Sequence, residues 1–473
     1  MEKVRSAPEH EEKGASMALS KRGRTYALFA IVVFACALGS LTQTVMNSML
    51  EGVRADFGVD ASVGQWLTTI YMLALGITVP AVTFLSQRFS IRRVVFLALA
   101  LLLAGGVVDV FAPTFEVLVF GRVLQAVGAG ITLPVLQSIA MMRFPRGQNG
   151  TAMGIAGIAM GFAPNIGPLI GGALVDTWGW RSFFVIFIAI VCILIFATFC
   201  LVESEEAPMR DARFEIVSFL YSTLGFGGLL LAFSNAASMS IASPLVWLPA
   251  IVGVVCLVLF VARQKRLEHP LISMRIFRSA HFRASFVAQN CLFASFMGIT
   301  LIVPLYVQGL LGLSAVEAGI VFVPATILAV VVNPLAGILS DKVGVRPVVL
   351  VAAVLLSIGA MSMAFVGDGT PLWLLTLLQT IRGMGVSALI GPLNSWGMGG
   401  LPREIMMDAS AFFAAVRQAC ASLGTAIMVL AITALSAVAQ TGAIDAVVAY
   451  QVAFGISAVL AICVLAVAVV KVR

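Results

Sequence analysis

The sequence predicts an all-α integral membrane protein with about fourteen transmembrane helices. Of its 473 residues, 60% are hydrophobic and only 11% are charged, and the mean hydropathy is +1.06. A soluble domain has about 25% charged residues, so a water-soluble fold could not bury this much apolar surface. Two further observations support the prediction: a series of long apolar runs, and basic residues that gather on one side of the membrane.

The apolar runs define the expected helices. A helix needs about 20 mostly apolar residues to cross the hydrocarbon core of a bilayer. Runs of this kind lie at 27–50, 64–85, 94–112, 115–142, 150–174, 181–202, 214–235, 244–262, 284–308, 317–339, 348–366, 372–399, 407–437 and 447–470. Several contain glycine or proline, which transmembrane helices tolerate.

The basic residues orient these spans. With the N-terminus inside, 24 of the 29 Lys and Arg residues lie in inner segments. The outer loops contain only Arg54 and Arg181, and the spans contain Arg122, Arg382 and Arg417. This is the positive-inside pattern, and it predicts a multi-pass protein of the cytoplasmic membrane with both termini in the cytoplasm. The net charge of +7 follows from this topology, so no nucleic-acid partner is expected.

Two polar inner segments, 203–212 and 263–282, flank a pair of spans within 214–262. Six spans precede the pair and six follow it. We therefore expect two six-helix halves with an inserted helix pair. The predicted parts are a cytoplasmic and disordered tail at 1–26, an N-terminal half at 27–202, a linker with the helix pair at 203–282 and a C-terminal half at 283–473.

The two halves contain related motifs. The inner loop at 85–94 resembles the loop at 339–348. In the fourth span, Arg122-x-x-Gln125-x-x-Gly128 aligns with Gln379-x-x-Arg382-x-x-Gly385 of the twelfth span, with Arg and Gln exchanged. Many secondary transporters are built from such repeats, with the substrate site between them.

Longer motifs point to one family. They are Gly337-Ile338-Leu339-Ser340-Asp341-Lys342-Val343-Gly344-Val345-Arg346, Arg122-x-x-Gln125-Ala126-x-Gly128, Gly161-x-x-Pro164-x-x-Gly167-Pro168-x-x-Gly171-Gly172, Trp180-Arg181-Ser182-Phe183-Phe184, the segment from His269 to Phe277, and the segment from Leu401 to Gln418. They resemble the major facilitator superfamily, and specifically its fourteen-helix drug:proton antiporter branch, over about residues 27–471. The resemblance implies the major facilitator fold, alternating access, and antiport of protons and amphipathic drugs.

The sequence departs from this family pattern in two places. The branch usually has an acid in the first span, where this chain has Thr42. In the first signature loop, Gln87 stands in place of an aspartate, and Thr83 and Ser90 stand in place of glycines. We therefore expect the gate to depend on the second loop, where Asp341 should bond the first amides of the next span and pair with Lys342 or Arg346.

The distribution of acids limits the substrate. None of the 22 Asp and Glu residues lies at the centre of a predicted span, whereas three arginines lie within spans. A neutral to positive cavity favours neutral, amphipathic or anionic substrates over dicationic drugs. Asp109, near the outer end of the third span, is the first candidate for a proton site. The alternative is a solvated charge at the outer rim.

Polar and glycine-rich positions complete the predicted site. The expected cavity liners are Gln43, Thr44, Asn47, Arg122, Gln125, Asn165, Gln289, Asn290, Asn333 and Asn394. The expected coupling and gating residues are Asp109, Arg122, Gly161, Pro164, Gly167, Pro168, Gly171, Gly337, Asp341, Gly344, Arg346, Arg382 and Arg417. Each polar residue could instead form an ordinary contact between helices.

No phosphate-binding loop or His/Cys cluster occurs in the sequence, so no cofactor, metal site or enzymatic activity is expected. The leading hypothesis is a monomeric exporter of amphipathic small molecules. Two alternatives stay open. One is a lipid or anionic-metabolite carrier, which could be facilitative. The other is a receptor that binds a ligand without moving it.

Overall fold

The computed structural model describes residues 8–64, 66–145, 147–203, 215–238, 243–267, 270–439 and 445–472, and these residues form helices and short connections without strands. The N-terminal half comprises α1 (Pro8–Phe57), α2 (Ala61–Gly64), α3 (Trp66–Arg88), α4 (Ile91–Val110), α5 (Phe115–Met142), α6 (Asn149–Gly157), η1 (Ile158–Phe162), α7 (Ala163–Trp178) and α8 (Arg181–Leu201). The inserted pair is α9 (Ile216–Ser238) and α10 (Pro244–Gln264). The C-terminal half comprises η2 (Met274–Arg278), α11 (Ala280–Leu305), η3 (Tyr306–Leu310), α12 (Ala315–Ile320), α13 (Val323–Val343), α14 (Val345–Met363), α15 (Leu372–Gly399), η4 (Arg403–Ile405), α16 (Met406–Ala439) and α17 (Ala446–Lys471).

Thirteen helical segments among the described residues are long and apolar enough to cross a membrane. The span expected at 150–174 is not one of them, because a π-helical turn at Ile158–Phe162 divides it into α6, η1 and α7. Pro164 lies two residues after this turn and has no N–H to donate to the carbonyl of Met160 within it, which favours a wider turn here. The three pieces follow one another without a break. The predicted all-α membrane fold is confirmed.

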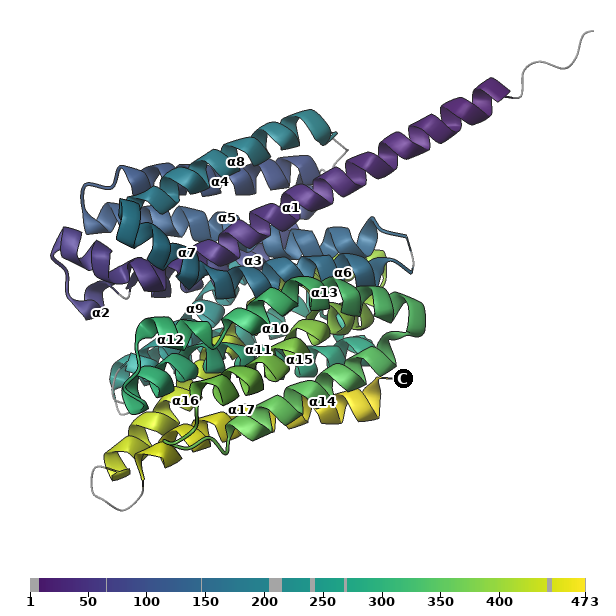
Figure 1. Cartoon of the computed structure of the whole chain (residues 1–473). Helices are drawn as coiled ribbons and strands as arrows, with labels where there is room; N and C mark the ends of the chain where they lie inside the picture. Colours follow the sequence, from purple (N-terminus) through teal and green to yellow (C-terminus); the bar gives the residue numbers. More distant parts are fainter. Residues whose placement is uncertain are drawn as a thin grey trace, which may run out of the picture.

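The two halves lie side by side (Figure 1), with α1 to α8 in one and α11 to α17 in the other. The chain begins and ends at the same end of the bundle, and we call this the inner end because the sequence places the basic loops there. The opposite end is the outer end.

The structure differs from the sequence-based expectation at the N-terminus. The tail was predicted to be disordered, but α1 begins at Pro8 and continues through the first span. Helix-favouring Glu, Lys, Ala, Met and Leu residues fill much of this segment, so the helix can extend past the apolar run. Residues 1–7 lie outside the described part of the chain.

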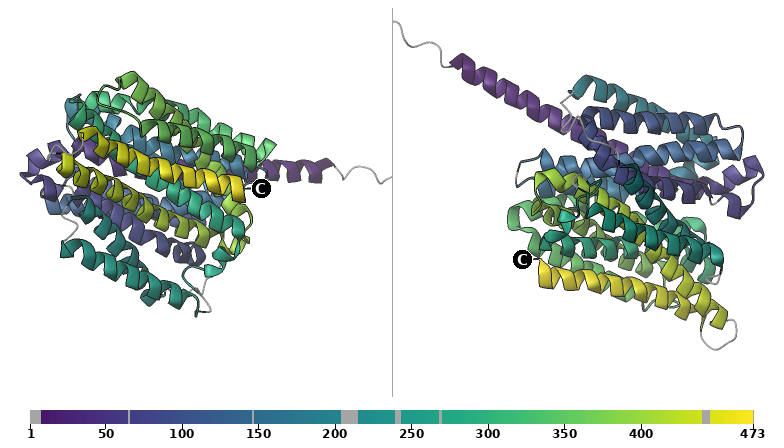
Figure 2. Two further views of the ribbon diagram at one scale, coloured as in Figure 1. Left: turned by 90° about the horizontal axis from the view of Figure 1, so that it is seen from below. Right: turned by 180° about the vertical axis from the view of Figure 1, so that it is seen from behind.

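The inserted pair lies at the side of the bundle, across the junction of the two halves (Figure 2). Helix α9 packs on α10, on α3 of the N-terminal half and on α16 of the C-terminal half. The hydroxyl groups of Thr69 on α3 and Ser234 on α9 lie 3.1 Å apart. Ala236 and Val246 of the pair share a small buried cluster with Ala426 of α16.

The halves pack tightly toward the inner end. The largest apolar cluster contains Met141 and Phe144 from the N-terminal half together with Met398, Phe412 and Phe413 from the C-terminal half. In contrast, the cluster at the outer end of the C-terminal half contains described residues of that half only. The direct contact between the halves is therefore concentrated at the inner end of the bundle.

Candidate substrate and proton sites

Arg122 forms the polar centre of the N-terminal half. Its side chain is fully buried, and its two Nη atoms donate to the Gln125 amide oxygen at 2.9 Å and to the Thr42 backbone oxygen of α1 at 3.0 Å. The guanidinium lies over the ring of Tyr71, 4.3 Å from the centroid. The Tyr71 hydroxyl in turn donates to the Gly39 carbonyl at 2.8 Å. Because a buried guanidinium needs partners in lipid, this network connects α5 to α1 and α3.

Arg382 has the equivalent role in the C-terminal half, although it stands at the position that corresponds to Gln125. It is fully buried and donates to the backbone oxygen of Ser295 on α11 at 2.9 Å and to the amide oxygen of Gln379 at 3.5 Å. In both halves, an arginine of the fourth span therefore bonds a carbonyl of the first span and a glutamine of its own helix. The exchange of Arg and Gln between the repeats preserves this arrangement.

Glycine contacts give the register of the repeat. Gly128 packs on Leu102 and the carbonyl of Ala98, and Gly385 packs on Leu356 and the carbonyl of Ala352. Residues 98 and 102 of α4 thus correspond to residues 352 and 356 of α14. Continuing this register along both helices pairs position 109 with position 363.

Asp109 and Met363 therefore occupy equivalent positions. Both side chains are fully buried. Asp109 packs against Gly121, whose missing side chain leaves room for the carboxylate, and its charge acts on that of Arg122. Neither carboxylate oxygen has a hydrogen-bond partner in the described part of the structure. The solvated-rim alternative is excluded, because the carboxylate is inside the helix bundle.

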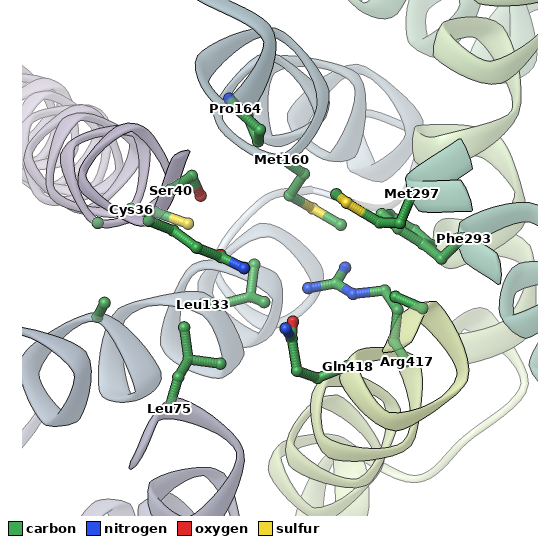
Figure 3. A pocket seen from close by; sticks show the side chains of 14 residues that line it. Cys36, Ser40, Leu75, Leu133, Met160, Pro164, Phe293, Met297, Arg417 and Gln418 are labelled. Atoms are coloured by element: carbon green, nitrogen blue, oxygen red, sulfur yellow. The ribbon is translucent and has the colours of Figure 1, made fainter. Parts of the chain in front are cut away.

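A cavity lies between the halves near the middle of the bundle (Figure 3). Its volume is about 50 Å³, which is room for a few water molecules. Its lining combines apolar and sulfur-containing side chains with a few polar ones: Cys36, Gly39, Ser40, Gln43, Leu75, Ala129, Leu133, Met160, Pro164, Phe293, Met297, Arg417, Gln418 and Ala421. No lining residue is acidic.

Asp341 connects the halves at the inner end. Its carboxylate accepts hydrogen bonds from the backbone N–H of Gly150 at 2.9 Å, the N–H of Thr151 at 2.7 Å and the Thr151 hydroxyl at 2.7 Å. These groups belong to the first turn of α6 in the opposite half, where backbone N–H groups have no partner within their own helix. The geometry corrects the sequence-based expectation: Asp341 bonds the first amides of α6 and not those of α14, and Lys342 and Arg346 are exposed.

Comparisons with known proteins agree with this architecture. Residues 29–425 match the sequence profile of the Major Facilitator Superfamily. The chain belongs to the major facilitator superfamily. It is 33% identical over 403 residues to an uncharacterized transporter of this type, YcnB of Bacillus subtilis, covering 85% of each chain. It is 31% identical over 416 residues to the lincomycin resistance protein LmrB of Listeria monocytogenes, covering 88% of this chain and 87% of that protein.

Among solved structures, the human organic anion transporter MFSD10 shares the fold, with a TM-score of 0.64 and 13% identity, over 93% of this chain and 99% of that chain. The prediction of a membrane transporter and not an enzyme is confirmed, because the superfamily and these relatives are transporters.

The glycine- and proline-rich segment of the fifth span, 161–172, packs against α1, and we call this contact the seam. Gly167 faces Thr44, and Gly171 faces Val45, both on α1. Pro164 lines the central cavity, and Gly161 faces Ile390 of the opposite half. The side chain of Pro168 is outside the described part of the structure.

The predicted cavity residues of the first span divide between different faces of α1. Gln43 lines the central cavity. The Thr44 hydroxyl donates to the Leu41 carbonyl at 3.3 Å and faces the seam with α7. Asn47 is exposed and accepts a hydrogen bond from the Thr68 hydroxyl at 3.3 Å.

The other predicted amides lie away from the described lining of the central cavity. Asn165 contributes to a second, smaller cavity with Gly161 and Gln379. Asn290 and Asn333 donate to the carbonyls four residues earlier in their own helices, at 2.7 Å and 2.9 Å. Gln289 and Asn394 are buried, and among the described residues neither amide atom of Asn394 has a hydrogen-bond partner.

At the second signature loop, Gly337 lies against Gly150 of the opposite half. Gly344 ends α13 with φ +93°, a conformation that favours glycine. Sequence reasoning missed Tyr71, Met160 and Phe293, which contact the arginines or line the cavity. Each resembles an ordinary apolar residue of a span, so only its neighbours reveal its place.

Proposed function

We propose that this transporter exports amphipathic small molecules across the cytoplasmic membrane by alternating access, as a monomer, and takes up protons in exchange. Superfamily membership establishes transport of small molecules, whereas the direction, the substrate class and the coupled proton are the proposal. The LmrB relative is a lincomycin resistance protein, which supports export of a drug-like compound.

The observation that carries the proton coupling is the buried carboxylate of Asp109, which has no hydrogen-bond partner among the described residues and packs against Gly121, the residue before Arg122. The fold does not require an acid here, because the equivalent residue of the other half is Met363. A buried acid within a membrane protein that is not needed for packing is typical of a proton or ion site. Asp109 would replace the acid that the family usually has at the position of Thr42.

Asp109 is connected to the substrate cavity through α5 and α1. It packs against Gly121, the residue before Arg122, and Arg122 bonds the Thr42 carbonyl of α1. Gln43, the next residue, lines the central cavity together with Ser40. Protonation of Asp109 removes a negative charge beside Arg122, which changes how strongly Arg122 holds α1. Proton binding and cavity shape are thereby coupled.

Two features support alternating access. The halves pack together at the inner end, where Asp341 bonds α6, and this favours a conformer closed toward the cytoplasm. The central cavity of about 50 Å³ is far smaller than the roughly 300 Å³ or more of a typical ligand pocket. A drug-sized substrate therefore needs the halves to separate around the cavity.

The test uses purified protein in liposomes that contain a pH-sensitive dye. A proton gradient is imposed in either direction, and a panel of neutral, anionic and cationic amphiphiles is added. Substrate flux that follows the gradient, with proton movement in the opposite direction, supports the proposal. Flux that is indifferent to the gradient would make the protein a facilitator. Binding without flux would make it a receptor.

A further inference from the structure

We infer that Arg417 is the anion-binding residue of the central cavity, and that it selects substrates with a single acidic head group on an apolar body. This inference rests on the proposed function, because it names the substrate class of the same cavity. It depends on how Arg417 differs from the other two arginines within the spans.

Arg122 and Arg382 are both bonded to backbone carbonyls of the protein. Arg417 is 9% exposed, whereas Arg122 and Arg382 are fully buried, and it lines the cavity. Among the described residues it forms no hydrogen bond and no ion pair. Its guanidinium lies over the ring of Phe293, 4.5 Å from the centroid. A cation–π contact leaves the five N–H donors of arginine without acceptors. Burying such donors unpaired is costly, so a ligand or water in the cavity must accept them.

Figure 3 shows Arg417 and Gln418 at the cavity, across from Ser40 of α1, with the side chains of Met160 and Met297 nearby. A planar guanidinium can hold a carboxylate or sulfonate through two parallel hydrogen bonds. Amide and hydroxyl groups beside it can donate to the same head group. The thioether and phenyl side chains suit an aliphatic or aromatic body and adapt to its shape.

The cavity also disfavours cations. Its described lining contains one guanidinium and no carboxylate, so a cationic substrate would meet a like charge at short range without compensation. Arg417 and Gln418 belong to the C-terminal half, whereas Ser40 and Gln43 belong to the N-terminal half. An anion held between them would connect substrate binding to the relative position of the halves.

The experiment measures binding in lipid nanodiscs without any gradient. Three probes share a phenyl group on a short chain: 4-phenylbutane-1-sulfonate, 4-phenylbutan-1-ol and trimethyl(3-phenylpropyl)ammonium. Calorimetry gives the affinity of each. We expect the wild type to bind the sulfonate at least about tenfold more tightly than the other two, as expected for a charge-assisted hydrogen bond in a buried site.

Three variants separate the charge of Arg417 from its packing. Arg417→Gln should remove the preference for the sulfonate, and Arg417→Lys should preserve the order of affinities with weaker binding. Gln418→Glu keeps Arg417 but gives it a carboxylate partner, so it should also remove the preference, even if Arg417→Gln fails to fold. Arg403→Gln, the matched control at an exposed arginine outside the cavity, should leave the preference unchanged.

The inference is overturned if the folded Arg417→Gln or Gln418→Glu variant prefers the sulfonate as strongly as the wild type does. It is also overturned if the wild type binds the ammonium probe most tightly or does not bind the sulfonate. The assay involves no transport. A wild type that binds the sulfonate through Arg417 but moves no protons would therefore contradict the proposed coupling and leave this inference intact.

Discussion

Replacing Asp341 with alanine tests how the inner end is held closed. The substitution removes the acceptor of three hydrogen bonds, with donor–acceptor distances of 2.9, 2.7 and 2.7 Å, that join α13 to the first turn of α6 in the other half. It leaves the helix ends themselves intact. We expect the closed conformer to lose population relative to conformers that are open toward the inner side.

The size of this effect follows from the contacts. A hydrogen bond to a charged group contributes about 1.5–3 kcal/mol net. All three bonds share one half-buried carboxylate, so we do not add them and take about 2 kcal/mol for the whole contact. That corresponds to a change of roughly 30-fold in the equilibrium between closed and open conformers.

Hydrogen exchange followed by mass spectrometry measures this contact directly. The N–H groups of Gly150 and Thr151 have no partner within α6, so Asp341 protects them. In Asp341→Ala, the peptide that contains both should exchange about 30-fold faster. Asp368→Ala, which removes an exposed carboxylate at the outer end of the same half, should leave that peptide unchanged. Unchanged protection in Asp341→Ala would show that Asp341 does not hold the inner end closed.

Two further predictions concern packing and pH. Where α6 packs on α13 of the other half, a methyl group at Gly154 would lie 2.5 Å from the backbone oxygen of Asn333. Gly154→Val should therefore force the inner end apart and speed hydrogen exchange in α6, as Asp341→Ala does. Normal protection in this variant would contradict the close packing of α6 on α13. The pKa of Glu215 is lowered to about 2, because the Arg263 side chain and then the Ser218 hydroxyl donate to its carboxylate. The stability from this pair is full above the ordinary carboxyl pKa of 4.5 and is lost as the pH falls toward 2. The melting temperature should therefore change less between pH 5 and pH 3 in Glu215→Gln than in the wild type. An equal change in both proteins would argue against the pair.

The fold could be predicted from the sequence because a lipid bilayer restricts the length and composition of the helices that cross it. The lengths of apolar runs and the side of the basic residues predict the number and direction of helices without any knowledge of packing. Of the fourteen expected spans, the one at 150–174 is not among the thirteen long helices, because a local π turn near Pro164 interrupts it. The repeat also predicted that the fourth span of each half contains one buried Arg–Gln pair, with the two residues exchanged.

The partners of individual side chains were harder to predict. The motif around Asp341 indicates a carboxylate that caps a helix, but nothing in its spacing says which half supplies that helix. Asp109 lies one residue from the end of α4, where an acid usually meets water. Only the contact with Gly121 on the neighbouring helix shows that it is buried.

The cavity was predicted in outline but not residue by residue. Cys36, Ser40 and Gln43 follow the spacing of one helix face and line it together. Thr44 is the next residue after Gln43, about 100° further around the helix, and faces the seam with Gly167. Polarity alone did not separate these faces, because both contain hydroxyl or amide side chains.

The most direct test of the central claim is proton movement in liposomes made with Asp109→Asn protein. The exposed acid Asp368 provides the matched control as Asp368→Asn. The account predicts that substrate addition drives proton movement in the wild type and in Asp368→Asn. In Asp109→Asn, proton movement should be absent although substrate still binds. Proton movement in Asp109→Asn equal to that of the wild type would show that Asp109 does not carry the coupled proton.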